Sequence, residues 1–393
     1  MRFLWLALSS LLLPAAVQAP VEPRGVSLTA DTETRWVAFD LTPGNQIRFA
    51  MQVDGKQATA ILDTGVSFSV ASRTFARAAA LPHADAPGRA AAIGGAVPLR
   101  WATVDTLALG GLERKGGRLA VVDLAPVSTS SAESVDILLG SDVLSCCALD
   151  IDYDARRFRL LPSGRMPFAG ESVPLRIGPT TQVFISEISV AGRRITPLIV
   201  DTGDGSAVTL SQSAWARSGA TPARTTTAIA FGLGGAIETD VAILPQIGFG
   251  RRSEANVEVR VEAAGGFSDQ TGTAGRIGSG LLQRFRVLLD PRAGHMVVSA
   301  GQGAGRMPVR STSGLLIGHD RGRLRVLHVM RGGPAAAAGW KDGELICTVD
   351  GSSVPPDAQG SVDTRWSAGV PGRTVAFGMC DGGRRTLTLR HFY

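Results

Sequence analysis

The stretch Ile61-Leu62-Asp63-Thr64-Gly65 recurs later in the chain as Ile199-Val200-Asp201-Thr202-Gly203. In each copy an Asp-Thr-Gly turn follows an apolar run that is typical of a buried strand. If the two turns face one another, they place two carboxyl groups in one site. A pair of carboxyl groups can share one proton and activate a water molecule against a peptide bond.

The recurring phrase belongs to a longer repeat. An apolar segment with a glycine, Ile137-Leu138-Leu139-Gly140, follows the first phrase, and Arg276-Ile277-Gly278 follows the second. Each marker glycine lies 77 residues after its aspartate (140 − 63 and 278 − 201). Equal spacing in two copies predicts one supersecondary unit that is used twice. The alternating residues 47–53 and the Asp54-Gly55 pair predict a hairpin with a type I′ turn ahead of the first phrase.

Each half also has a glycine cluster within a β-like region. The clusters contain Gly94 and Gly95 in the first half, and Gly234 and Gly235 in the second. Such glycines suit the tip of a hairpin that covers a site, and they suit an ordinary loop equally well. Both interpretations stay open at this point.

The duplicated Asp-Thr-Gly turns and the apolar-Gly markers resemble the retropepsin-like and pepsin-like aspartic proteases over roughly residues 40 to 300. The resemblance implies an all-β, bilobal aspartic-protease fold with lobes at 40–165 and 175–300. It also implies that Asp63 and Asp201 are the catalytic pair.

By the same resemblance, the residues that follow each aspartate support the pair. Thr64 and Thr202 would join the two turns by hydrogen bonds, and Gly65 and Gly203 would let the backbone turn tightly. The glycine clusters would be the tips of flaps that close over a peptide.

The sequence departs from the family pattern in three places. Val66 and Asp204 follow the two turns, where the family usually has Ser, Thr or Ala, and Arg276 replaces the Leu138 of the first marker. We expect Asp204 to disturb the ionisation of the pair if its side chain points inward. The lobes are short and no tyrosine lies near a glycine cluster, which favours a duplicated, single-chain retropepsin-like arrangement with a monomeric active unit.

The C-terminal part resembles a second family. A Gly-rich linker at 301–308 precedes residues 309–393, which resemble the small α+β PDZ domains of exported bacterial proteases. The resemblance implies that Gly314, Leu315, Leu316 and Ile317 form a loop that binds peptide C-termini, while the peptide adds as a strand. The alternative is a structural cap that binds nothing.

Composition and the N-terminus give the remaining expectations. The chain has 393 residues and a net charge of +6, but its arginines are scattered, so we expect no nucleic-acid partner. Residues 1–19 read as an export signal, which indicates a bacterial periplasmic or secreted protein, with a membrane tether if the signal is retained. Cys347 and Cys380 are the better candidates for a disulfide, and the adjacent Cys146 and Cys147 are interpreted as small buried residues.

Together these observations predict an aspartic endopeptidase that acts on extended polypeptides with no metal and no cofactor. The alternative is a non-catalytic peptide-binding protein on a decayed protease scaffold. The intact Asp-Thr-Gly sequence at both sites argues against decay.

Overall fold

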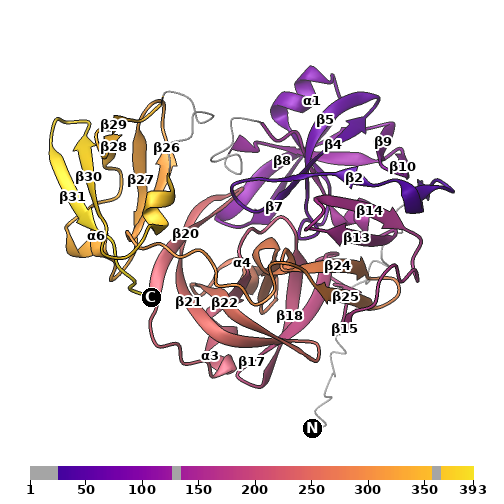
Figure 1. Ribbon diagram of the computed structural model, residues 1–393. Coiled ribbons are helices and arrows are strands. Elements are labelled where there is room, and N and C mark those ends of the chain that lie inside the picture. Colours follow the sequence, from indigo (N-terminus) through magenta and orange to yellow (C-terminus); the bar gives the residue numbers. More distant parts are fainter. Residues whose placement is uncertain (1–24, 126–133, 356–363) are drawn as a thin grey trace, which may run out of the picture.

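The computed structural model describes residues 25–125, 134–355 and 364–393. It consists mostly of β-strands in two adjoining lobes, with a smaller sheet beside them (Figure 1). The predicted all-β, two-lobed architecture is therefore confirmed. The predicted export signal lies outside the described residues. Within the described ranges, no helix is both long enough and apolar enough to cross a bilayer.

The first lobe is built on an eleven-stranded sheet. Its strands are β1 (Val26–Leu28), β3 (Asp40–Leu41), β4 (Ile47–Val53), β5 (Lys56–Leu62), β6 (Val70–Ser72), β7 (His83–Ala92), β8 (Gly95–Thr103), β9 (Thr106–Leu109), β10 (Leu112–Lys115), β11 (Arg118–Val122) and β12 (Ile137–Leu139). The turn between β4 and β5 has positive φ at both central residues, Asp54 (49°) and Gly55 (73°). Positive φ at both positions defines the type I′ turn, so the predicted hairpin is confirmed.

The second lobe is built on an eight-stranded sheet. Its strands are β16 (Arg176–Ile177), β17 (Phe184–Val190), β18 (Arg193–Asp201), β19 (Val208–Ser211), β20 (Thr226–Gly232), β21 (Gly235–Phe249), β22 (Arg252–Glu262) and β23 (Gly275–Gly278).

The two lobes pair their central strands in the same way. In the first lobe β5 runs parallel to β12, with Leu62 opposite Leu139. In the second lobe β18 runs parallel to β23, with Asp201 opposite Gly278. The next strands repeat the pattern, because β6 is antiparallel to β12 and parallel to β11, as β19 is to β23 and β22. The equal spacing in the sequence therefore corresponds to an aspartate held beside a marker glycine in each lobe.

A six-stranded sheet joins the lobes. Its strands are β2 (Val37–Ala38), β13 (Ala148–Asp152), β14 (Arg157–Leu161), β15 (Glu171–Pro174), β24 (Phe285–Asp290) and β25 (His295–Ala300). β13 of the first lobe pairs with β24 of the second, with Asp150 opposite Leu288. One continuous apolar core extends through both lobes and this sheet.

Short helices connect the strands. They are α1 (Arg73–Ala78), α2 (Ser141–Leu144), α3 (Gln212–Ser218), α4 (Phe267–Gln270), α5 (Ser279–Leu282) and α6 (Pro334–Ala337), with 3₁₀ turns at Thr32–Thr34 and Thr364–Ala368. Ser72 and Ser211 cap α1 and α3 by accepting a backbone N–H, which ends the strand and starts the helix in the same way in both lobes.

The C-terminal part forms a separate six-stranded sheet with its own core. Its strands are β26 (Leu315–His319), β27 (Leu324–Val329), β28 (Leu345–Val349), β29 (Ser352–Ser353), β30 (Thr374–Met379) and β31 (Arg384–Thr388). Pro334 is at the start of α6, where a proline suits the first turn because the N–H that it lacks would have no partner within the helix. A disulfide joins Cys347 of β28 to Cys380, which is the predicted pair. Figure 1 shows this C-terminal sheet beside the hairpin of β20 and β21.

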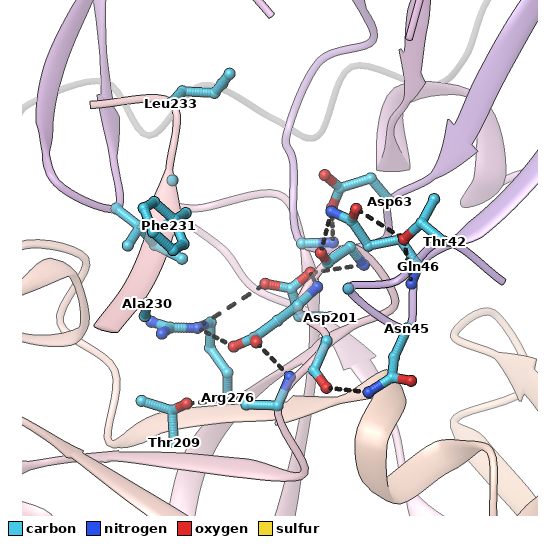
Figure 2. A pocket seen from close by; sticks show the side chains of 18 of the residues that line it. Thr42, Asn45, Gln46, Asp63, Asp201, Thr209, Ala230, Phe231, Leu233 and Arg276 are labelled. Atoms are coloured by element: carbon cyan, nitrogen blue, oxygen red, sulfur yellow. Dashed lines mark hydrogen bonds and ion pairs between the residues drawn. The ribbon is translucent and has the colours of Figure 1, made fainter. Parts of the chain in front are cut away.

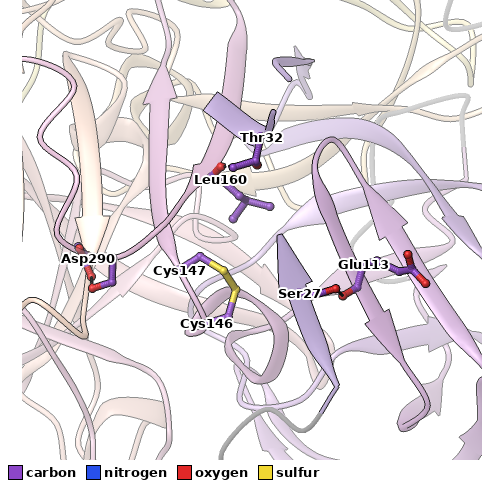
Figure 3. The surroundings of a disulfide bond; sticks show 8 residues. Ser27, Thr32, Glu113, Cys146, Cys147, Leu160 and Asp290 are labelled. Atoms are coloured by element: carbon purple, nitrogen blue, oxygen red, sulfur yellow. Dashed lines mark hydrogen bonds between the residues drawn. A yellow bond between two sulfur atoms is a disulfide. The ribbon is translucent and has the colours of Figure 1, made fainter. Parts of the chain in front are cut away.

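The second cysteine pair differs from expectation. The structure joins Cys146 to Cys147 by a disulfide, whereas the sequence interpretation left them as two small buried residues (Figure 3). Both cysteines lie in the short connection between α2 and β13.

Candidate active site

The two Asp-Thr-Gly turns meet between the lobes. Thr64 and Thr202 hold them together, because the backbone N–H of each threonine donates to the hydroxyl of the other at 3.1 Å. The hydroxyls then donate across the interface, from Thr64 to the carbonyl of Val200 (2.6 Å) and from Thr202 to that of Leu62 (2.7 Å). Both threonines are fully buried. Each turn is therefore fixed by the opposite lobe, and neither hydroxyl lacks a partner.

The glycines of the turns leave room for the carboxyl groups. A Cβ added at Gly65 would lie 2.3 Å from the Asp201 carboxyl carbon. A Cβ at Gly203 would lie 2.4 Å from the carboxyl carbon of Asp63. A side chain at either position would therefore displace the aspartate of the opposite lobe. Glycine is required here for close approach.

Backbone amides orient both carboxyl groups. The N–H of Gly65 donates to Oδ1 of Asp63 at 3.1 Å, and the N–H of Gly203 donates to Oδ1 of Asp201 at 3.0 Å. Asp201 accepts a second backbone bond, from Asp204 at 3.0 Å. Both aspartates are among the residues that line the cavity between the lobes.

Burial raises the pKa of both carboxyl groups, so each holds its proton more strongly than an exposed aspartate does. It raises the pKa of Asp63 to about 6, although hydrogen bonds from Gly65 and Asp201 oppose the rise. Burial also raises the pKa of Asp201 well above its usual range, and the negative charges of Asp63 and Asp204 add to this. Two adjacent carboxyl groups share one proton under these conditions, since both cannot ionise readily.

Asp204 does not enter the site as an unpaired charge. Its Oδ2 accepts from Nε of Arg276 at 2.9 Å, and Nη1 of Arg276 pairs with Oε1 of Glu262 at 2.7 Å. Nε of Arg276 also lies 4.0 Å from Oδ2 of Asp201. Burial raises the pKa of Asp204, but the charge and hydrogen bond of Arg276 more than offset it, so the net shift is downward. The lobes differ here, since the first has Val66 and Leu138 at the equivalent places.

A turn of the first lobe supports the second aspartate. The side-chain amide of Gln46 donates to the carbonyl of Gly203 at 2.9 Å, and that of Asn45 donates to Gly205 at 3.1 Å (Figure 2). A similar contact joins the lobes near the first aspartate, because the hydroxyl of Ser141, next to the first marker glycine, donates to the carbonyl of Gln182 in the second lobe at 2.6 Å. Sequence reasoning missed these residues, because they lie far from the motif they support and only the Asp-Thr-Gly turns carried a signal.

The glycine clusters form the tips of two hairpins that meet. Gly94 lies between β7 and β8, and Gly234 lies between β20 and β21. The N–H of Gly234 donates to the carbonyl of Ile93 at 2.9 Å, and a Cβ at Gly94 would lie 2.5 Å from the carbonyl oxygen of Gly235. Gly95 and Gly235 have φ of 130° and 118°, which favours glycine at both tips. The interpretation as paired hairpin tips therefore fits better than an ordinary loop.

The turns and the hairpins line a cavity of about 420 Å³. Figure 2 shows Phe231 and Leu233 of the second hairpin across this cavity from Asp63, with Arg276 beside Asp201. A space of this size accommodates several residues of an extended peptide rather than a folded domain.

The four residues expected in a peptide-binding loop of the C-terminal sheet lie in different surroundings. Leu316 and Ile317 line the same cavity as the two aspartates. Leu315 is buried in the core of its own sheet. The amides of Gly314 and Leu315 donate to the hydroxyls of Ser311 and Ser313, at 2.9 and 3.0 Å.

Comparison with known proteins gives one family match. Residues 49–143 match the family model described as "Aspartyl protease". The match covers the first lobe from β4 through most of α2 and includes the first Asp-Thr-Gly turn. It supports a peptidase class of hydrolase and agrees with the mostly β, aspartic-protease-like fold. A search of curated proteins found no match.

Proposed function

We propose that this protein is an aspartic endopeptidase in which Asp63 and Asp201 form the catalytic pair. One observation carries the proposal. The two Asp-Thr-Gly turns hold one another by reciprocal threonine bonds, and each carboxyl group packs against the glycine of the opposite turn. A binding protein has no need of two desolvated carboxyl groups with raised pKa at one point of its cavity.

The chemistry follows from the different surroundings of the two carboxyl groups. Asp201 is the more buried and has the neighbouring Asp204 charge, so it retains the shared proton. Ionised Asp63 takes a proton from water as the water oxygen bonds to the carbonyl carbon of the substrate, and Asp201 gives its proton to the carbonyl oxygen. The C–N bond then breaks as Asp63 passes its proton to the leaving nitrogen and a hydroxyl proton returns to Asp201. Both carboxyl groups regain their starting states.

The glycine-tipped hairpins would act as flaps over the bound peptide. Their tips meet above the cavity through a backbone hydrogen bond, so entry of a chain requires them to separate. Closing over the peptide would exclude bulk water from the aspartates and strengthen the electrostatic interactions inside the cavity.

We further propose that residues 309–393 are a PDZ-like module of an exported protein and that the lobes span 40–165 and 175–300. The separate core of the C-terminal sheet and its disulfide support the first part, since disulfides persist in oxidising compartments. Binding of peptide C-termini stays a prediction, and two amides of the expected loop, Gly314 and Leu315, already donate to serine hydroxyls.

The test replaces each aspartate by asparagine in the purified protein. We expect Asp63→Asn and Asp201→Asn to lower kcat on fluorescein-labelled casein at least about 100-fold, which is a usual effect of losing an acid or base. Asp290→Asn is the matched control, because Asp290 is buried in the second lobe and bonds to Ser163 and Gly164 outside the cavity. Activity that survives either dyad change would refute the assignment. Peptide binding without turnover by the parent protein would favour the non-catalytic alternative.

A further inference from the structure

The cavity that contains the aspartates extends to the C-terminal sheet. Leu316 and Ile317 of β26 and Leu327 of β27 line it together with Asp63 and Asp201. Most of the cavity wall therefore belongs to the two lobes. An additional wall, formed by Leu316, Ile317 and Leu327, belongs to the C-terminal sheet, which lies more than a hundred residues after the second aspartate. A peptide that reaches the aspartates has the C-terminal sheet within reach.

The part of the cavity wall that the C-terminal sheet supplies is apolar. Two of its three side chains do not belong to the core of that sheet. Leu316 and Leu327 are half-buried and are not among the residues of the C-terminal core, whereas Ile317 packs partly against that core. Across the cavity, Phe231 of β20 has 37% of its surface exposed, which is high for a phenylalanine. Partly exposed apolar side chains that line one cavity are typical of a binding surface. An apolar side chain bound in this part of the cavity would reduce the exposure of these residues to water.

The backbone beside the wall is also open. β26 is the terminal strand of the C-terminal sheet, and β20 is the terminal strand of the second-lobe sheet. In the described part of the chain, each has a neighbouring strand on one side alone. Open strand edges accept an extended chain as an additional strand. The ligand chemistry that fits is therefore an extended polypeptide.

Polar contacts fix the wall against the second hairpin. Nε2 of His328 lies 2.7 Å from the hydroxyl of Thr227 in β20, and Nη2 of Arg331 pairs with Asp240 of β21 at 2.7 Å. The hydroxyl of Thr226 donates to the carbonyl of Arg331 at 2.9 Å. His328 is buried, so its contact is shielded from competing water. The position of the apolar wall relative to the cavity is therefore set by β20 and β21.

We propose that Leu316 and Leu327 form, with Phe231, a subsite for an apolar side chain of the polypeptide that the aspartates cleave. The peptide runs along the open edge of β26 and continues into the cavity. The subsite reads an internal side chain and requires no free C-terminus, since the amides of Gly314 and Leu315 are already bonded. This inference rests on the proposed endopeptidase function and adds a specificity determinant to it.

The experiment separates binding from turnover. Binding is measured by fluorescence anisotropy in the Asp63→Asn background, with labelled decapeptides that have Leu or Asp at each position in turn, as free acids and as C-terminal amides. We expect Leu316→Asp to raise Kd for the best leucine peptide by about 10-fold or more, consistent with losing the burial of one leucine side chain. Amidated and free-acid peptides should bind equally. In the parent protein, Leu316→Asp should raise KM for that peptide and leave kcat unchanged.

The matched control is Val370→Asp, since Val370 is 75% exposed in the same module and is not among the residues that line the cavity. It should leave Kd unchanged, and Leu316→Ala with a thermal melt replaces the aspartate variant if that variant fails to fold. Unchanged Kd in Leu316→Asp and Leu316→Ala, with casein still cleaved, would overturn the subsite and leave the proposed function standing. A Kd that depends on a free carboxylate would overturn it in favour of C-terminal recognition. Leucine-dependent binding without any cleavage would support the subsite and refute the endopeptidase.

Discussion

Arg276 offers the sharpest test of how the site is tuned. Its Nε lies 4.0 Å from Oδ2 of Asp201, and both side chains are buried. A unit charge at this distance is worth about 4 kcal/mol at an effective dielectric constant of about 20. That energy corresponds to about three pKa units. Arg276→Met removes the cation, so the pKa of the aspartate pair should rise.

The expected result is a pH profile that moves to higher pH. Protonation of the unpaired Asp204 would absorb part of the effect, so we expect both limbs of kcat/KM against pH to move by about one to three units. The single substitution should also destabilise the fold by about 3–5 kcal/mol, because it leaves Asp204 and Glu262 as buried charges without their cation. Arg276 acts through Asp201 and is a positioning residue.

Two further variants separate electrostatics from folding. Asp204→Asn with Arg276→Met removes a negative charge as well as the positive one, so the pH shift should shrink. Arg284→Met is the matched control, since Arg284 is buried and pairs with Glu254 at 2.8 Å in the same lobe but outside the cavity. It should cost stability and leave the pH profile in place. A folded Arg276→Met protein with the parental pH profile would refute the reasoning.

Two predictions concern stability. The pKa of Asp63 is raised from 3.8 to about 6 in the folded protein, so its contribution to stability is fully present below pH 3.8 and is lost as the pH rises from there to about 6. Relative to Asp63→Asn, the parent should therefore lose roughly 3 kcal/mol of unfolding free energy between pH 3 and pH 7, measured by urea titration; equal pH slopes in the two proteins would contradict this. Thr202→Val leaves the N–H of Thr64 and the carbonyl of Leu62 buried without partners, and should lower stability by about 2–5 kcal/mol in the same assay. A loss below about 0.5 kcal/mol would mean that the reciprocal bonds do not hold the lobes together.

The repeat could be recognised from the sequence because the same strand pairing and the same spacing between aspartate and marker glycine occur in both lobes. Asp201 lies opposite Gly278 across two parallel strands, and Asp63 donates its N–H to Leu139 next to the first marker glycine. The connection between turn and marker has the same length in both lobes, so the repeated pairing appears in the sequence as a repeated spacing. The two Asp-Thr-Gly turns therefore located the aspartates and both lobes.

Contacts between segments that are distant in the sequence could not be predicted from motifs or spacing. Asp204 and Arg276 were each noted as departures from the family pattern, but their ion pair depends on a three-dimensional approach that no local spacing encodes. Gln46 lacks any motif, and its contact with Gly203 exists because the lobes face one another. The adjacent cysteines were interpreted as unpaired, because their spacing does not give the local backbone conformation that decides whether two consecutive sulfur atoms meet.

The joining sheet has a consequence for how the molecule folds. β13 of the first lobe and β24 of the second are direct neighbours, and the apolar core continues through both. Neither lobe can complete this sheet alone, so an isolated lobe would expose a strand edge and part of its core to water. The two lobes should thus gain and lose their structure together, as a single cooperative unit, and the aspartate pair exists only while that unit is intact.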